Sequence, residues 1–156
     1  MSAVATEAGV ATGTAYVHYA SKNELVLAAH VEAMKDLSAA ALEADDARLE
    51  PAIRFRRLWL AVYRHLTADP VRARFLAQVE HSPYAIEAKA RRLTDVDPLL
   101  DLLASPVLDE FVADLPLSFL HDLGFGPSIR LAASDVELTE PTLDRLVEAC
   151  WRSITA

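Results

Sequence analysis

Apolar residues recur at spacings of three and four along three segments of the chain, and this spacing predicts amphipathic helices. The predicted helices cover about residues 21–44, residues 51–66 and the C-terminal residues. The residues that share one face are Leu27, Val31, Met34 and Ala41 in the first helix, Phe55, Leu58, Trp59, Val62 and Leu66 in the second, and Leu143, Leu146, Val147, Cys150, Trp151 and Ile154 in the third. Alternation of β-branched residues is absent, so the fold class is predicted to be all-α.

Prolines divide the rest of the chain into short helices. An Asp or Ser side chain accepts hydrogen bonds from the free N–H groups of a helix start, and proline fits the first helical position. Such pairs occur at Asp69-Pro70, Ser82-Pro83, Asp97-Pro98 and Ser105-Pro106. Ser21 and Glu24 have the spacing of a capping box. Residues 115–134 are apolar but contain Gly124-Phe125-Gly126-Pro127, which leaves a loop and a kinked helix both open.

Composition limits the possible functions. The 156 residues fit one domain, or one domain with a small appendage, and no apolar run approaches the roughly 18 residues of a membrane span. A single cysteine, Cys150, excludes an internal disulfide framework and fits a reducing cytoplasm. The net charge of −8 argues against a broad nucleic-acid surface, so any contact with DNA is expected to be local.

The opening stretch, VATEAGVATGTAYVHYASKNEL at residues 4–25, differs from the apolar helices that follow. It predicts a short helix, a turn at Gly9 and a second short helix over residues 12–19, which is the layout of a helix-turn-helix. Small and hydroxyl side chains on the second helix suit a close approach to base edges. Lys22, in the first turn of the next helix, has the reach for a phosphate.

This stretch resembles the DNA-binding signature of the TetR (tetracycline-repressor) family over about twenty contiguous residues. The resemblance implies a bacterial, cytoplasmic homodimer that represses transcription and is released from operator DNA by a small molecule. It places a helix-turn-helix domain at residues 1–22 and an all-α ligand-binding and dimerisation domain at residues 23–156. The recognition helix would be residues 12–19. The candidate DNA-contacting residues are Thr12, Gly13, Thr14, Tyr16, Val17, His18, Tyr19 and Lys22.

The start of the chain departs from the family pattern. Family members have a full helix before this signature, usually preceded by a basic arm, whereas only residues 1–3 precede it here. Residues 4–25 also carry Glu7 and Glu24 against Lys22, a local charge of −1. We expect that an upstream helix is missing and that the chain without it binds DNA weakly. The alternative is a helical ligand-binding or dimerisation module that has lost DNA binding.

The middle helices are expected to enclose a cavity for a small-molecule effector of unknown identity, with Trp59 or Phe75 at its wall. Large or polar side chains on these helices could line it, although each could instead be ordinary core. The candidates are Trp59, Tyr63, Phe75, Gln78, His81 and Phe111, with Tyr84 and His121 also considered. The C-terminal stripe, Leu143, Leu146, Val147, Cys150, Trp151 and Ile154, is expected to form a four-helix dimer interface together with residues 115–134.

Catalytic and metal chemistry have no support in the sequence. No Ser/His/Asp or Cys/His grouping has local support, and no glycine-rich phosphate loop occurs. The five histidines show no i, i+4 pairing with one another. We therefore expect no enzymatic activity, no cofactor, no metal and no membrane partner.

Overall fold

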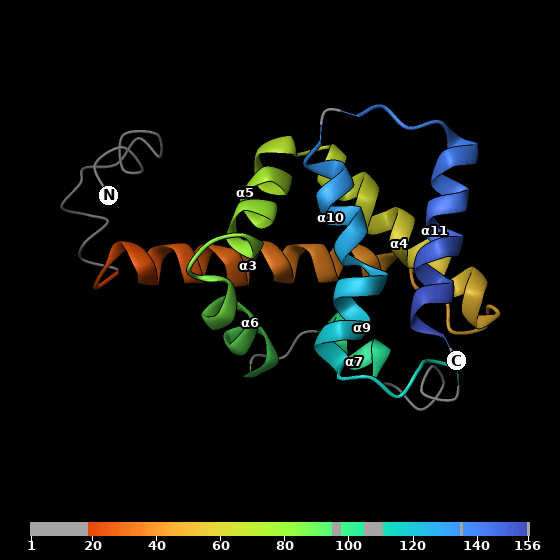
Figure 1. The fold of residues 1–156 in the computed structure, drawn as a ribbon, viewed down its shortest axis with the longest axis horizontal. Coiled ribbons are helices and arrows are strands. Elements are labelled where there is room, and N and C mark those ends of the chain that lie inside the picture. Colours follow the sequence, from red (N-terminus) through yellow and green to blue (C-terminus); the bar gives the residue numbers. More distant parts are fainter. Residues whose placement is uncertain (1–18, 95–97, 105–110, 135, 156) are drawn as a thin grey trace.

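The computed structural model describes residues 19–94, 98–104, 111–134 and 136–155. The expected all-α class is confirmed over these ranges, where helices are joined by short connections and one isolated β-bridge pairs Val112 with Thr155. The helices are α3 (Lys22–Glu43), α4 (Pro51–Thr67), α5 (Pro70–Glu80), α6 (Ala85–Thr94), α7 (Pro98–Leu103), α9 (Leu117–Gly124), α10 (Gly126–Ala132) and α11 (Glu140–Ile154). Figure 1 shows the long α3 extending past the other helices at its N-terminal end.

The predicted start of α3 is confirmed. The hydroxyl of Ser21 accepts a hydrogen bond of 3.1 Å from the backbone N–H of Glu24, as the first half of a capping box requires. The carboxylate of Glu24 is bound by Arg91 of α6. The cap residue therefore begins α3, while the acidic residue of the box joins α3 to another helix.

The turn from α3 to α4 contains a nearly buried ion pair. The guanidinium of Arg54 donates two hydrogen bonds, of 2.6 and 2.7 Å, to the carboxylate of Asp45. These bonds lower the pKa of Asp45. These two bonds join the first turn of α4 to the segment that follows α3, and so hold α4 where it returns along α3.

Helix α4 lies at the centre of the bundle and contacts α3, α5, α10 and α11. All five residues of its predicted apolar face are buried, namely Phe55, Leu58, Trp59, Val62 and Leu66. Trp59 is 0% exposed, and its indole N–H donates a 3.0 Å hydrogen bond to the carbonyl oxygen of Gly124. A buried indole N–H usually has such a partner, and this bond joins α4 to the C-terminal end of α9.

The Gly124–Pro127 segment forms a junction between two helices. Helix α9 ends at Gly124 and α10 begins at Gly126, with Phe125 between them in a right-handed helical conformation. Pro127 stands in the first turn of α10, where its missing N–H leaves no hydrogen bond unmade. The kinked-helix alternative is thus closer to the structure than the loop.

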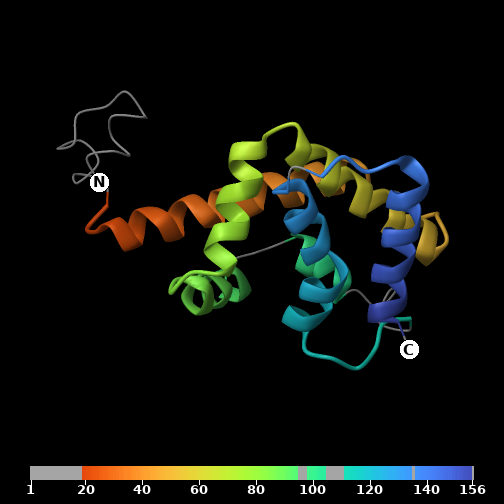
Figure 2. The same cartoon turned by 45° about the horizontal axis from the view of Figure 1, so that its top comes forward.

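Helices α5 and α6 pack on the N-terminal half of α3 (Figures 1 and 2). The carboxylate of Asp69 caps α5 by accepting a 3.1 Å hydrogen bond from the N–H of Arg72, as predicted. A small cluster of Leu27, Val79 and Ala88 joins the three helices. This cluster is separate from the large core around α4, so α6 is held by few apolar contacts.

Much of the C-terminal stripe belongs to the core of the same chain. Four of its six side chains are buried against the chain itself: Leu143, Val147, Cys150 and Ile154. The cause is that α11 packs on α4 and α9. Only Leu146 and Trp151 keep a partly exposed surface, so the six residues together cannot all face a second subunit.

The Trp59 hydrogen bond gives a stability prediction. Replacing Trp59 with Phe should lower the free energy of unfolding by about 2–3 kcal/mol, because it removes ring volume from a closed core and leaves a buried carbonyl without its donor. Urea denaturation measures the change. Val71→Ala, at a side chain that is 71% accessible, should change the free energy of unfolding by less than about 0.5 kcal/mol. Equal costs for the two variants would contradict a special role for Trp59.

Candidate functional site

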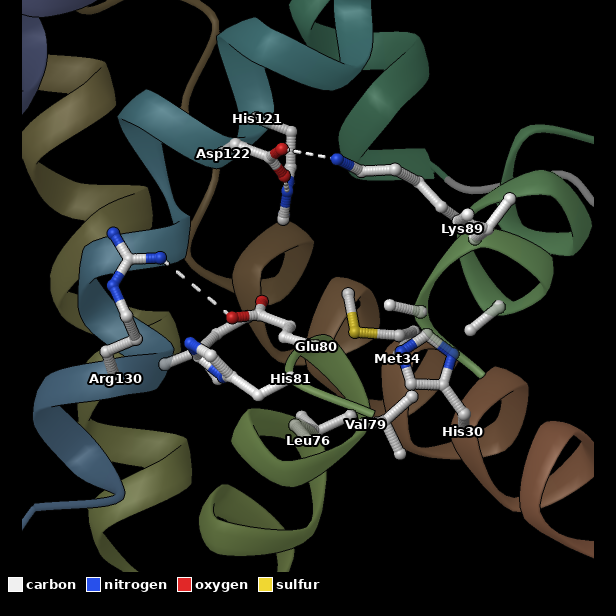
Figure 3. A pocket seen from close by; sticks show the side chains of 14 residues that line it. His30, Met34, Leu76, Val79, Glu80, His81, Lys89, His121, Asp122 and Arg130 are labelled. Carbon is white, nitrogen blue, oxygen red and sulfur yellow. Dashed lines mark hydrogen bonds and ion pairs between the residues drawn. The ribbon is translucent and has the colours of Figure 1, made fainter. Parts of the chain in front are cut away.

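A cavity of about 360 Å³ lies between α3, α5, α6, α9 and α10 (Figure 3). Its apolar wall is formed by side chains from four of these helices: Met34, Leu76, Val79, Ala85, Ile86, Ala88 and Ile129. Polar groups from all five helices reach the same space: His30, Glu80, His81, Lys89, His121, Asp122 and Arg130. An apolar pocket with a few polar groups is the usual form of a small-molecule site, and this volume suits a small ligand.

One side of the cavity is crossed by an ion pair between α6 and α9. The ammonium of Lys89 donates a hydrogen bond to the carboxylate of Asp122, as Figure 3 shows. The imidazole Nδ1 of His121 lies 3.6 Å from the other carboxylate oxygen of Asp122. Because His121 and Lys89 both lie beside this carboxylate, the pKa of Asp122 falls to about 2. Asp122 is therefore ionised at neutral pH and holds Lys89 across the opening.

Glu80 and Arg130 form a second, looser pair at the cavity. The distance from Glu80 Oε2 to Arg130 Nη1 is 3.9 Å, which is too long for a hydrogen bond. Burial raises the pKa of Glu80, and the charge of Arg130 only partly opposes this effect. Arg130 lies against Gly126, where an added Cβ atom would stand 3.1 Å from Nη1. Gly126 therefore leaves room for the guanidinium at the edge of the cavity.

Helix α6 also binds the first turn of α3. The guanidinium of Arg91 donates hydrogen bonds of 2.9 and 3.2 Å to the two carboxylate oxygens of Glu24. These bonds lower the pKa of Glu24. The hydroxyl of Tyr84 donates a 3.2 Å hydrogen bond to the side-chain oxygen of Asn23. One short helix thus contacts both the cavity and the start of α3.

The candidate ligand residues from the sequence are only partly brought together. His81 lines the cavity, as does His121. Trp59 and Phe75 do not, contrary to expectation: Trp59 is enclosed in the main core and Phe75 borders a separate groove between α3 and α5. Tyr63 stacks on Trp59 with ring centroids 5.7 Å apart, and Gln78 and Phe111 are exposed away from the cavity.

Sequence reasoning missed most of the polar groups of the cavity. They are His30, Glu80, Lys89, Asp122 and Arg130. These residues come from five helices, and only packing of the whole bundle brings them together. One usable signal was the pair of adjacent residues His121 and Asp122, inside an otherwise apolar segment.

Most candidate DNA-contacting residues lie outside the described residues. These are Thr12, Gly13, Thr14, Tyr16, Val17 and His18. Of the other two, Tyr19 is half-buried and Lys22 is exposed as the first residue of α3. A contact between Lys22 and a phosphate stays a prediction.

Two further properties concern only the part of the chain that the structure describes. Within it, no group of three or more His, Cys, Asp or Glu residues is arranged to hold a metal ion. None of its helices is both long enough and apolar enough to cross a membrane.

A helical bundle with a cavity, whose long helix α3 follows a sequence that predicts a helix-turn-helix, has the layout expected of a transcription regulator. Two family models match the chain. The model described as Tetracyclin repressor-like, C-terminal domain, matches residues 51–155, and the model described as Bacterial regulatory proteins, tetR family, matches residues 1–29. The chain belongs to the TetR family of transcription regulators.

Solved structures of the same family share this fold. A TetR family transcription regulator from Marinobacter aquaeolei VT8 is 22% identical, with a TM-score of 0.74 over 97% of this chain and 82% of that chain. A TetR-family transcriptional regulator from Haemophilus influenzae is 24% identical, with a TM-score of 0.75 over 97% of this chain and 82% of that one. These relatives are regulators of transcription, as the resemblance of the sequence implied.

Proposed function

We propose that this protein is a repressor that binds operator DNA as a homodimer and is released by a small molecule bound in the cavity. The observation that carries the proposal is the double role of α6. Ala85, Ile86, Ala88 and Lys89 of this helix face the cavity. Arg91 of α6 and Tyr84, the residue directly before the helix, bind the first turn of α3. The predicted recognition helix ends directly before that turn.

The geometry of α6 supports a coupling between ligand and DNA. Helix α6 has few apolar contacts with the bundle, so a ligand that fills the cavity can displace it at modest cost. Its polar bonds to Glu24 and Asn23 would carry that displacement to the start of α3. A dimer reads two half-sites about 34 Å apart, so a small shift of α3 in each subunit weakens binding to both.

The surface that would join two subunits lies beside the C-terminal stripe. Helix α9 packs on α11 and exposes Phe119 and Leu123, which are 58% and 40% accessible. The partly exposed faces of Leu146 and Trp151 lie on α11. Pairing α9 and α11 with the same helices of a second subunit would bury these side chains in a four-helix interface. The interface is thus proposed for the outer face of α11 and α9.

Substitutions at the DNA-reading segment test operator binding. Lys22→Ala should weaken binding to all sequences alike and reduce the salt slope by about one, because it removes a phosphate contact. Thr14→Ala should change sequence preference if Thr14 reads a base. Gel shifts over a range of salt concentrations measure both effects. Lys35→Ala, at an exposed lysine farther along α3, is the matched control. Absence of any specific DNA site would favour the ligand-module alternative.

Substitutions on α9 and α11 test the dimer. Phe119→Arg and Leu146→Arg should each give a folded monomer, because the new charge would be buried without a partner at the interface. Val71→Arg changes an exposed apolar residue of α5, which is 71% accessible, and should leave the dimer intact. Light scattering and circular dichroism measure mass and folding. A monomeric wild-type protein at micromolar concentration would refute the homodimer.

A pair of substitutions in α6 tests the coupling without an effector. Ala85→Trp should imitate a bound ligand by pushing α6 outward, and should weaken operator binding by about fivefold or more. Adding Arg91→Met should restore most of the affinity, because α6 would then move without pulling on Glu24. Ala90→Trp, on the exposed face of α6, should change little. Equal operator affinities for Ala85→Trp and the double variant would show that Arg91 does not carry the coupling.

A further inference from the structure

Glu80 is the most enclosed of the four charged side chains of the cavity, since that of Asp122 is 40% accessible. Two carboxylates, Glu80 and Asp122, and two cations, Lys89 and Arg130, line the cavity. The side chains of Lys89 and Arg130 are each 48% accessible, whereas that of Glu80 is 30% accessible. Water screens the two cations at the edge more than it screens the carboxylate inside. An occupant of the cavity therefore meets the charge of Glu80 with the least screening by water.

The four charges also differ in how fully they are bound. Lys89 and Asp122 are joined by a direct hydrogen bond. Glu80 faces Arg130 across 3.9 Å, a distance that leaves its carboxylate able to accept a stronger donor. In Figure 3 this carboxylate points into the open space at the centre of the cavity. Glu80 is thus the acidic group that is best placed to bind a ligand.

The surroundings of Glu80 indicate what else the ligand must have. Met34, Leu76 and Val79 form an apolar surface close to the carboxylate. Burial of this surface would stabilise an aromatic or aliphatic body by about 25 cal/mol per Å². The whole protein carries a net charge of −8, which favours the approach of cations over anions.

We infer that the effector is a lipophilic amine, in which an apolar body fills the cavity and a protonated nitrogen donates a hydrogen bond to Glu80. This inference rests on the proposed function, because it names the chemical class of the molecule that the cavity binds. The raised pKa of Glu80 agrees with it, since a carboxylate that is poorly solvated gains more from a cationic partner than a solvated one does.

Three probes that differ only in their polar group test the inference: 4-phenylbutylamine, 4-phenylbutanol and 4-phenylbutyrate. Isothermal titration calorimetry with the whole protein at pH 7 measures their affinities. The amine should bind at least tenfold more tightly than the alcohol, and the alcohol more tightly than the carboxylate. Glu80→Gln should reduce amine affinity at least tenfold and leave alcohol affinity nearly unchanged, because only the amine depends on the charge.

Two further variants test whether the probes bind in the cavity and whether the loss of amine affinity is specific to Glu80. Glu148→Gln removes the carboxylate of a similar 3.9 Å ion pair, with Arg152 on the far α11, and should leave all three affinities unchanged. Ala85→Trp should abolish binding of every probe by filling the cavity. Circular dichroism confirms that each variant is folded.

Several results would overturn the inference. These are tightest binding by 4-phenylbutyrate, equal binding by all three probes, an amine affinity insensitive to Glu80→Gln, or no amine binding at millimolar concentration. The proposed function is judged separately by operator binding and by the α6 variants. A regulator whose cavity prefers anions would still bind its operator, whereas a protein without operator binding could still bind the amine.

Discussion

The hydrogen bond from the indole of Trp59 to the carbonyl of Gly124 fixes the helices on which the cavity depends. The carbonyl is free to accept this bond because α9 ends at Gly124 and the chain turns through Phe125 into α10. The same turn sends His121 and Asp122 toward the cavity from one helix and Arg130 from the next. A continuous helix through this segment would present these side chains in a different direction. The central core and the polar site therefore share one junction.

The long elements of the fold were predictable because their apolar residues repeat at the helical period. Helix α4 shows this best: all five residues of its predicted face are buried, and the helix begins at the predicted Pro51. The start of α3 was equally clear, because the Ser21 cap depends only on neighbouring residues. The family itself was predictable for a similar reason, since its signature is a continuous stretch of sequence.

The cavity was not predictable in the same way. Glu80, Lys89 and Asp122 stand on three helices, and nothing in their local sequence distinguishes them from solvated charges. Trp59 was a natural candidate because it is large and has a polar edge, but its size is what places it in the core. The C-terminal stripe shows the same limit of prediction from sequence patterns. Periodicity identifies the apolar face of α11, yet it cannot tell whether the chain itself or a second subunit covers that face.

The bonds between α6 and α3 set a limit on the strength of the proposed coupling. Arg91 and Glu24 are both partly exposed, so water screens the ion pair between them and keeps it weak. The bond between Tyr84 and Asn23 is also at the surface. Weak surface bonds suit allosteric coupling, because the free energy that couples two sites is small. Bonds of this strength hold the start of α3 in place while the cavity is empty, and a small ligand supplies enough binding energy to displace them. A much stronger connection would fix α3 in one position, and the ligand could not shift it.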